Sequence, residues 1–255
     1  LIKSEKDIVS NYIWDKTFDG NMNSKISWEH LLNQSSDWHG NLFGINHWED
    51  RPDKRKNIDD WRTESQREPG TYYKYNDVRV NVLAYSLLQV YRKSLPIILK
   101  NYIMDPIGAS NSWRWYGYEN SWVNIDGLMV QSVSGGGHNG GGVFINSEDH
   151  ARFGLLYLNN GMWNDKRIIS EDWIKKSTTS SKTNLEYGYM WWLNSKDGED
   201  YAKSDWKNVS NNIYYGAGFG GNYIVVIPDE DMVVVGRWLG RGTIGTFIQM
   251  ILESK

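Results

Sequence analysis

Cysteine is absent from the 255 residues of this chain, and so is any long apolar segment. Without cysteine the protein has no disulfide and no thiolate metal site, although this names no cellular compartment. No apolar run approaches the roughly 18 residues that a membrane-spanning helix needs. A strong charge of either sign is also lacking, because the net charge is -3 and charged residues make up 23%. This balance argues against disorder and against a nucleic-acid partner.

The basic residues are scattered, and their one short run, Lys54–Lys56, is flanked by aspartates. We expect this run to be a solvated loop. The first residue is Leu1, and no signal-peptide pattern follows it. We expect the natural start to lie upstream, so the compartment stays open. With 40% hydrophobic residues, the chain can bury the core of one large domain or of two intergrown subdomains.

Aromatic residues are abundant, with 14 tryptophans and 16 tyrosines. Many of them fall into two clusters, Trp113–Trp122 and Tyr187–Trp192. Large rings of this kind fill cores and pack loops. They also line clefts that hold apolar or sugar-like ligands. We favour packing and keep the aromatic-walled cleft as the alternative.

Apolar spacing and capping residues predict alternating helices and strands. A period near 3.6 residues predicts helices over 77–93 and 244–251. Capping residues predict three more helices, which begin at Ser27, Ser147 and Ser170. A further helix is expected to open at Ser94 and to end at 106–108. A period of two residues predicts strands over 187–193, 222–227 and 232–239. Residues 37–70 are polar and long for a plain connection, so they form either a functional loop or short elements.

Two histidines within that polar stretch raise the question of a metal site. They stand near three acidic residues, the five together being Asp37, His39, His47, Glu49 and Asp50. The spacing fits no recognised ligand pattern. We therefore favour a solvated loop and expect no bound metal.

The tripeptide Tyr75-Asn76-Asp77 stands at the head of the predicted helix 77–93. A tyrosine is a poor base at its ordinary pKa of about 10. A helix N-terminus and a cationic neighbour favour the phenolate, which can then relay a proton. Asp77 is placed to cap the helix and hold the loop rigid. Taken alone, the tripeptide is better explained as a helix cap with an aromatic neighbour.

In its wider context the tripeptide resembles the Tyr-x-Asn motif of the serine beta-lactamase and penicillin-binding-protein-like hydrolases. The resemblance is strongest to the class C, esterase and 6-aminohexanoate-dimer-hydrolase branch. Other segments resemble that family in the same order along almost the whole chain: its first helix and turn (26–37), helix stop (106–109), glycine loop (135–137), Asp-x-x-Arg-Phe helix (149–154) and C-terminal sheet (187–192 and 218–229). Each segment is a weak signal, and the ordered set is a strong one.

The resemblance implies a beta-lactamase/transpeptidase-like α/β (α+β) fold, with an antiparallel sheet flanked by helices and a helical subdomain. It implies a serine hydrolase that acts on a small ester, amide or peptide-like substrate through an acyl-enzyme, without cofactor or metal. Tyr75 would relay the proton, with Asp77 as its organiser, and the N–H of Phe219 would form part of the oxyanion hole. The glycine loop with His138 would lie beside the cleft. A periplasmic or extracellular location is slightly favoured.

Two departures from the family bear on activity. Where the family has Lys or His, then Thr or Ser, then Gly, this chain has Gly216-Ala217-Gly218. Without the cation we expect a neutral ester or amide substrate in place of a carboxylate-bearing beta-lactam. The family's Ser-x-x-Lys pair, one helical turn apart, supplies the attacking serine and its base. The one match here, Ser204–Lys207, follows the tyrosine motif and lies in a polar run, so we do not expect it to be the nucleophile.

We therefore expect the chain to begin after its Ser-x-x-Lys pair and to be inactive by itself. We expect a single domain fragment over 1–255, mainly helices and loops to about residue 180 and then the C-terminal strands and last helix. One alternative is a binding protein or pseudoenzyme that keeps the cleft without the chemistry. The other is a carbohydrate-binding module with an aromatic platform.

Overall fold

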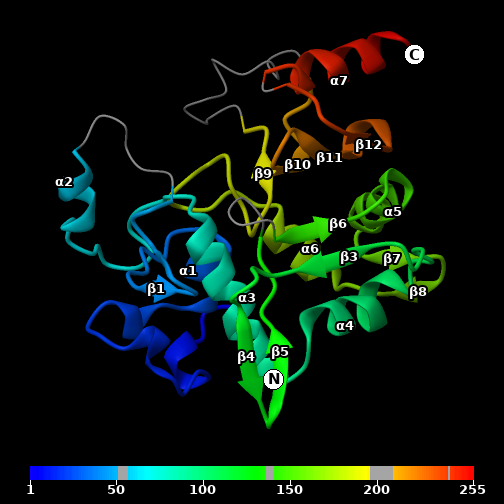
Figure 1. The fold of residues 1–255 in the computed structure, drawn as a ribbon. Helices are drawn as coiled ribbons and strands as arrows, with labels where there is room; N and C mark the ends of the chain where they lie inside the picture. The colour runs from blue at the N-terminus through cyan, green and yellow to red at the C-terminus, as the bar shows by residue number, and fades with distance from the viewer. Residues whose placement is uncertain (51–56, 136–140, 196–208, 241) are drawn as a thin grey trace. The chain divides into compact units, whose positions relative to one another are not determined.

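The computed structural model of the chain describes residues 1–50, 57–135, 141–195, 209–240 and 242–255 (Figure 1). Its contacts divide into two compact units. The first unit comprises residues 1–98 and 114–143, and the second comprises residues 99–113 and 144–255. Three features of interest, the Lys54–Lys56 run, His138 and the Ser204–Lys207 match, lie outside the described residues. The division near residue 180 rests on element content, and it stays a prediction.

The first unit consists of short elements around one long helix. Its helices are α1 (Trp28–Leu32), α2 (Ile58–Arg62), α3 (Asp77–Tyr91) and most of α4 (Leu95–Leu99), preceded by the 3-10 turns η1 (Val9–Asn11), η2 (Lys16–Phe18) and η3 (Asn23–Lys25). Its strands pair two by two, β1 (Asn41–Leu42) with β2 (Ile45–Asn46), β4 (Trp122–Ile125) with β5 (Leu128–Gln131), and β3 (Arg114–Tyr116) with β6 (Gly142–Phe144).

The long helix α3 is the centre of the first unit. Its side chains Ala84 and Leu88 form a buried cluster with Leu95, Ile125 and Val133. Eleven of its fifteen residues are buried, which is typical of a helix that is covered on most sides. The predicted helix 77–93 is thereby confirmed, two residues shorter at its C-terminal end.

The second unit carries the main sheet. Its elements are η4 (Lys100–Met104, a π-helical turn), α5 (Ser147–Leu158), β7 (Met162–Trp163), β8 (Lys166–Arg167), α6 (Glu171–Ser177), β9 (Trp192–Leu193), β10 (Tyr214–Gly218), β11 (Asn222–Ile227), η6 (Pro228–Glu230), β12 (Met232–Gly236) and α7 (Ile244–Glu253). The four-stranded antiparallel sheet has the order β12-β11-β10-β9. No helix among the described residues is long and apolar enough to cross a membrane.

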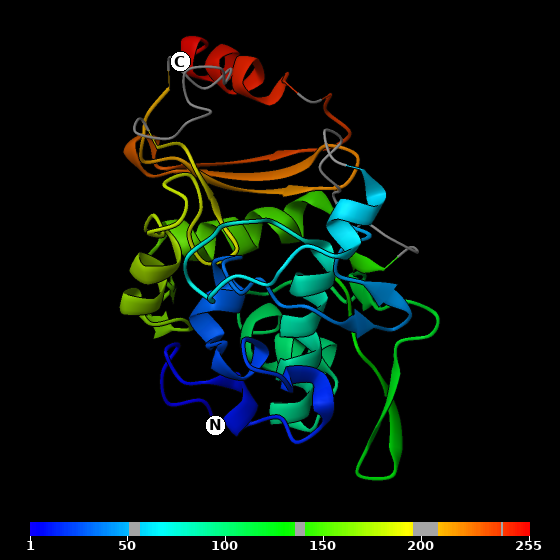
Figure 2. The same cartoon turned by 90° about the vertical axis from the view of Figure 1, so that its left-hand side faces the viewer.

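Helices cover both faces of this sheet, α7 on one and α5 on the other (Figure 2). Strand β11 supplies both cores because its side chains alternate. Val225 packs in the cluster that contains Ile248 of α7, and Val226 packs in the cluster that contains Tyr157 of α5. Gly154 lets α5 approach the sheet closely, since a β-carbon there would lie 2.6 Å from a Val233 methyl group.

Two of the predicted helix caps are confirmed, and the cap predicted for α5 is wrong. Ser27 and Ser170 cap α1 and α6 as expected, through hydrogen bonds from backbone N–H groups three residues later. Ser147 is the first residue of α5, and the cap is Asn146, whose Oδ1 accepts the N–H of Asp149 at 2.8 Å. Both residue types cap helices well, so sequence alone did not separate these neighbours.

Two predicted strands are shorter than expected because the backbone turns. In the segment 187–193 only Trp192–Leu193 is a strand, since Met190 takes a left-handed conformation with φ +62°. Likewise β12 ends at Gly236, short of 239, because Trp238 has φ +55°. The predicted strand 222–227 is confirmed in full. The two-stranded hairpins of both units were not foreseen, because strands of two to four residues leave little periodic signal.

Four of the nine tryptophan and tyrosine rings in the two clusters pack in the interior. Trp113, Tyr118, Tyr187 and Trp191 are buried, which confirms the packing interpretation for these four rings. Trp191 stacks on Phe153, is tilted against Tyr157 and meets Tyr214 edge to face, at ring-centroid distances of 4.6 to 6.4 Å. Others in the clusters are exposed at the surface, namely Tyr116 and Trp122.

His150 of α5 should make the second unit sensitive to acid. Its Nδ1 is buried without a hydrogen-bond partner among the described residues, and burial, with the charge of Arg237, lowers its pKa from 6.5 to about 4. In the unfolded chain His150 is protonated below about pH 6.5, whereas in the folded chain it is protonated only below about pH 4. The free energy of unfolding therefore falls as pH drops from about 6.5 to about 4. We expect His150→Phe to shrink the difference between urea midpoints at pH 7 and pH 5. An unchanged difference would contradict this role for His150.

Candidate active site

The predicted tyrosine motif lies where the sequence places it, at the start of α3. Tyr75 is half-buried and precedes the helix by two residues. Asn76 caps α3, because its Oδ1 accepts the N–H of Arg79 at 3.1 Å. The expectation that Asp77 is the cap is therefore wrong, and Asp77 is the first helical residue. A cation adjoins the tyrosine in sequence, since Lys74 is half-buried and its pKa is lowered by burial and then by the charge of Arg79.

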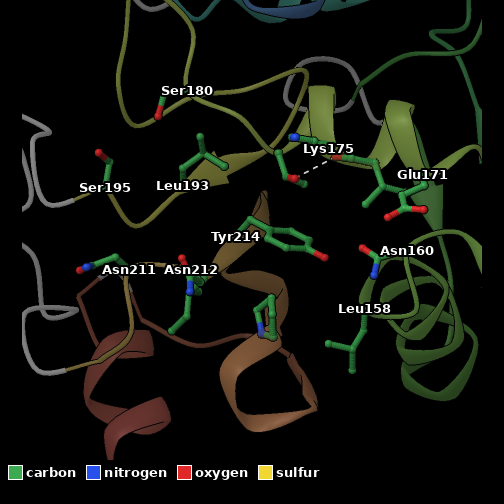
Figure 3. A pocket seen from close by; sticks show the side chains of 14 residues that line it. Leu158, Asn160, Glu171, Lys175, Ser180, Leu193, Ser195, Asn211, Asn212 and Tyr214 are labelled. Atoms are coloured by element: carbon green, nitrogen blue, oxygen red, sulfur yellow. Dashed lines mark hydrogen bonds between the residues drawn. The ribbon is translucent and has the colours of Figure 1, made fainter.

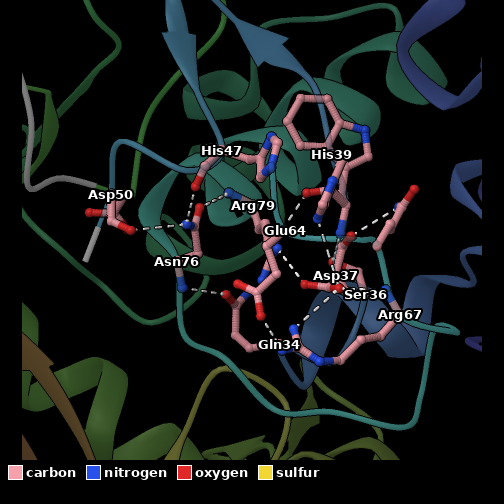
Figure 4. Close-up of polar contacts among 12 residues, drawn as sticks. Gln34, Ser36, Asp37, His39, His47, Asp50, Glu64, Arg67, Asn76 and Arg79 are labelled. Atoms are coloured by element: carbon pink, nitrogen blue, oxygen red, sulfur yellow. Dashed lines mark hydrogen bonds and ion pairs between the residues drawn. The ribbon is translucent and has the colours of Figure 1, made fainter. Parts of the chain in front are cut away.

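Hydrogen bonds from distant segments hold this loop in place (Figure 4). The side-chain amide of Asn76 donates to the carbonyl of His47 at 2.8 Å, and its backbone N–H donates to Oε1 of Gln34 at 3.1 Å. The backbone N–H of Asp77 donates to Oδ2 of Asp50 at 2.5 Å. The tripeptide is thus fixed by the turn after α1 and by the segment that follows β2.

A buried ion pair lies behind the motif. Arg79 Nη2 donates to Oδ1 of Asp37 at 2.7 Å, and each of the two residues is only 2% exposed. Asp37 also accepts the backbone N–H of Arg67 at 2.8 Å. Burial raises the pKa of the Asp37 carboxyl, but the charge of Arg79 and the Arg67 N–H outweigh it and hold that pKa below its usual value. Asp37 is therefore ionised at neutral pH and joins α3 to the turn after α1.

The histidines of the polar stretch stack on each other beside this pair. The ring centroids of His39 and His47 are 3.9 Å apart, and both side chains are half-buried. Burial lowers the pKa of both, that of His47 to about 4, so both are neutral at pH 7. The solvated-loop prediction is wrong here, because Asp37 and Asp50 are buried as well. No group of His, Asp and Glu within the described part of the chain could hold a metal ion.

The second set of predicted residues lies on β10 of the second unit. Gly216-Ala217-Gly218 pairs with β11 over its whole length, whereas β9 pairs only with Tyr214 and Tyr215. On the side away from β11, the described residues therefore place no strand beside 216–218. Ala217 and Gly218 are exposed, and Gly216 is half-buried.

Phe219 directly follows β10, which ends at Gly218, and it opens the turn to β11. Its role as an oxyanion donor stays a prediction. Gly220 and Gly221 complete this turn with φ of +75° and +78°, a conformation that favours glycine. The Phe219 side chain is 81% exposed.

The predicted site residues divide between the two units. Tyr75 and Asp77 belong to the first, and residues 216–219 belong to the second. His138 is outside the described residues. Convergence of these groups in one cleft therefore stays a prediction.

A cavity of about 690 Å³ lies elsewhere in the second unit (Figure 3). Its wall includes Leu158, Asn160, Lys175, Leu193, Asn212 and Tyr214, and none of the predicted site residues lines it. The Tyr214 hydroxyl points into this space, and burial raises its pKa. The lining mixes amides, hydroxyls, a few apolar side chains and the charged side chains of Glu171 and Lys175.

Comparison with known proteins gives one family match. Residues 6–237 match the family model described as Beta-lactamase, and no curated protein matches the chain.

Solved structures resemble the chain at low sequence identity. A protein assigned as a beta-lactamase from Bacteroides dorei DSM 17855 is 14% identical with a TM-score of 0.65, and the match covers 99% of this chain and 79% of that one. The hydrolase EstCE1, with promiscuous acyltransferase activity, is 14% identical with a TM-score of 0.63 and coverage of 98% and 77%. A penicillin-binding protein from Bacillus halodurans is 16% identical with a TM-score of 0.61 and coverage of 98% and 77%. Similarity at these identities shows the fold and leaves the activity open.

Proposed function

We propose, because this chain belongs to the Beta-lactamase family, that it forms part of a serine hydrolase that cleaves neutral esters or amides through an acyl-enzyme. The family and its beta-lactamase/transpeptidase-like fold confirm the resemblance drawn from the sequence. The observation that carries the proposal is the anchored loop at the head of α3. There, Tyr75 is half-buried between two residues whose backbone N–H groups are both hydrogen-bonded to Gln34.

In this proposal Tyr75 moves the proton. The serine hydroxyl loses its proton as its oxygen attacks the substrate carbonyl, and the tyrosine–lysine pair carries that proton to the leaving oxygen or nitrogen. Water then attacks the acyl carbon, and the same groups pass one proton of that water to the serine oxygen as the serine–acyl bond breaks. Asp77 acts indirectly, since its backbone N–H ties the start of α3 to Asp50. We propose that protein outside residues 1–255 supplies the serine and its lysine.

The strand β10 supports a neutral substrate. Its Gly216-Ala217-Gly218 segment brings no cation and no hydroxyl, so a substrate carboxylate would find no charged partner from this strand. The backbone N–H groups of the segment remain, and a backbone N–H can stabilise an oxyanion whatever side chain its residue carries. We propose the N–H of Phe219, at the start of the hairpin turn, as one of these donors.

Residues 1–255 alone should have no acyl-transfer activity. We expect p-nitrophenyl acetate and nitrocefin to be consumed no faster than in buffer, because the covalent nucleophile is missing. A stopped assay together with intact-mass analysis measures both turnover and any adduct. A product burst with one equivalent of acyl-enzyme would contradict the expectation, and Ser204→Ala would show whether Ser204 carried the acyl group.

A longer protein that supplies the family's Ser-x-x-Lys pair to this chain, called the whole protein below, tests the function itself. We expect a higher kcat/KM for p-nitrophenyl acetate than for nitrocefin, because the site lacks a cation for the beta-lactam carboxylate. A clear preference for nitrocefin would contradict the neutral substrate, and failure to turn over either would favour a ligand-binding pseudoenzyme. The loss of cation and hydroxyl at 216–217 is the observation that keeps this second candidate in view.

A further inference from the structure

Gln34 occupies an unusual position for a glutamine. It follows the end of α1 in the turn that leads to Asp37, and it is fully buried. Its backbone is left-handed, with φ +58°. A residue other than glycine carries strain in this conformation and persists in it only where its surroundings fix it. The hydrogen bonds of Gln34 show what those surroundings are.

Gln34 bonds to both chain neighbours of Tyr75. Its backbone carbonyl accepts the N–H of Lys74 at 3.0 Å, and its side-chain Oε1 accepts the N–H of Asn76 at 3.1 Å. The two partners lie 40 and 42 positions further along the chain, so these contacts are tertiary. One residue thereby grips the peptide units before and after the tyrosine.

The third contact of Gln34 fixes the direction of its amide. Nε2 donates to the carbonyl of Leu31 at 3.0 Å, which leaves Oε1 as the acceptor that faces Asn76 (Figure 4). Only a side chain with both a donor and an acceptor makes this pair of bonds. Both Gln34 and Asn76 are 0% exposed, so water does not replace a lost bond there.

We infer that Gln34 is a positioning residue for Tyr75, an inference that rests on the proposed role of Tyr75 in proton transfer. With the flanking peptides held, the Cα–Cβ direction of Tyr75 is set before a substrate arrives. Asp50 and His47 hold the helix side of the same loop through Asp77 and Asn76. Gln34 also holds the peptide unit before the tyrosine, through the N–H of Lys74.

The test begins with the 255-residue chain and reports on Tyr75 itself. Tyrosine labelled with 13C at Cζ gives one signal per ring, and Tyr75→Phe assigns the signal of Tyr75. We expect Gln34→Met to move or broaden this signal while the signals of second-unit tyrosines such as Tyr214 stay in place. A Tyr75 signal identical to that of the wild-type chain would overturn the inference.

Gln66→Met is the matched control. Gln66 also donates from Nε2 into the polar cluster of the first unit, to Asn23 Oδ1 and to the carbonyl of Asp37. It has no hydrogen bond to residues 74–76, so its replacement should leave the Tyr75 signal unchanged. An equal shift in both variants would mean a general loosening of the unit and would overturn the inference.

A second variant keeps the test decisive should Gln34→Met fail to give a dispersed spectrum. Gln34→Glu retains an oxygen for the N–H of Asn76 and loses the donor to Leu31. We expect the Tyr75 signal to broaden less in Gln34→Glu than in Gln34→Met, because one of the two side-chain hydrogen bonds is kept. Broadening as large as in the unfolded chain, with the second-unit signals intact, would overturn the specific role of the Asn76 contact.

Kinetics of the whole protein separate this inference from the proposed function. Misplacing a catalytic group by about 1 Å can cost about a hundredfold in rate. We expect Gln34→Met to lower kcat for p-nitrophenyl acetate by about that factor and to change KM less than about twofold. If Tyr75→Phe left the rate unchanged, the proposed function would fail while the NMR result still decided whether Gln34 positions the ring. If Tyr75→Phe lowered the rate and Gln34→Met left it at the wild-type value, the inference alone would fail.

Discussion

Tyr75→Phe lowers kcat/KM for p-nitrophenyl acetate by about a hundred- to ten-thousand-fold in the whole protein, the usual range for a positioned proton transfer. The substitution removes the hydroxyl that would pass the proton and keeps the half-buried ring. Unfolding by urea should therefore change little while turnover falls. Steady-state rates and urea midpoints of the same preparations check both statements.

Tyr72→Phe is the control for this result. Tyr72 lies three residues earlier, is 40% exposed, and has the Arg67 guanidinium 4.0 Å from the centre of its ring. Its hydroxyl has no place in the proposed proton path, so the rate should stay within about twofold of wild type, well below a proton-transfer effect. Equal rates for Tyr75→Phe and wild type would remove Tyr75 from the mechanism.

Arg79→Met should destabilise the protein by about 3–5 kcal/mol, because it removes the nearest cation from the buried carboxylate of Asp37 and leaves only the Arg67 guanidinium, at 3.7 Å. Burial then raises the pKa of that carboxyl in the folded state. Its penalty is present above the unfolded pKa of 3.8 and shrinks as pH falls toward that value. Urea unfolding at pH 7 and pH 5 measures the loss and its direction with pH.

An exposed pair of the same kind provides the comparison. Arg92 and Asp126 form an ion pair whose side chains are 46% and 66% exposed. Arg92→Met should cost no more than about 1 kcal/mol, as exposed pairs do. The double variant Asp37→Asn with Arg79→Met should be more stable than Arg79→Met alone, since no buried charge remains. A loss of equal size in Arg79→Met and Arg92→Met would contradict the importance of burial.

The sequence predicted those features that repeat or that lie close together in the chain. Residues 77–93 carry a helical period long enough to be distinctive, and 222–227 carries a clear apolar strand. The tyrosine motif was recognised because it precedes that helix and because other family segments follow it in order. These features depend on neighbours within a few positions.

The supports of the motif could not be found in this way. Gln34 and Asp50 meet residues 76–77 across 42 and 27 positions, and neither has a local pattern that points there. Asp37 suggested an exposed loop, because an acidic residue among histidines gives no sign of a buried arginine partner. The left-handed backbone conformation of Met190 and Trp238 could not be predicted from the sequence either, since neither residue type favours it.

The path of the chain between the two units has a consequence for biosynthesis. The first unit is interrupted after residue 98 and resumes at 114–143, and the segment 99–113 belongs to the second unit. Within that unit, Ser110 is held by hydrogen bonds to Asp149 of α5, at 2.5 and 3.0 Å. Neither unit is therefore one continuous stretch of chain.

A ribosome that has made residue 98 has not yet delivered the whole first unit. Residues 99–143 take about 2–9 s more at about 5–20 residues per second. Meanwhile the segment 99–113 emerges before α5, to which it binds. The first unit is therefore complete only after residue 143 has been made, by which time part of the second unit is already synthesised, and no single cut in the chain separates the two units.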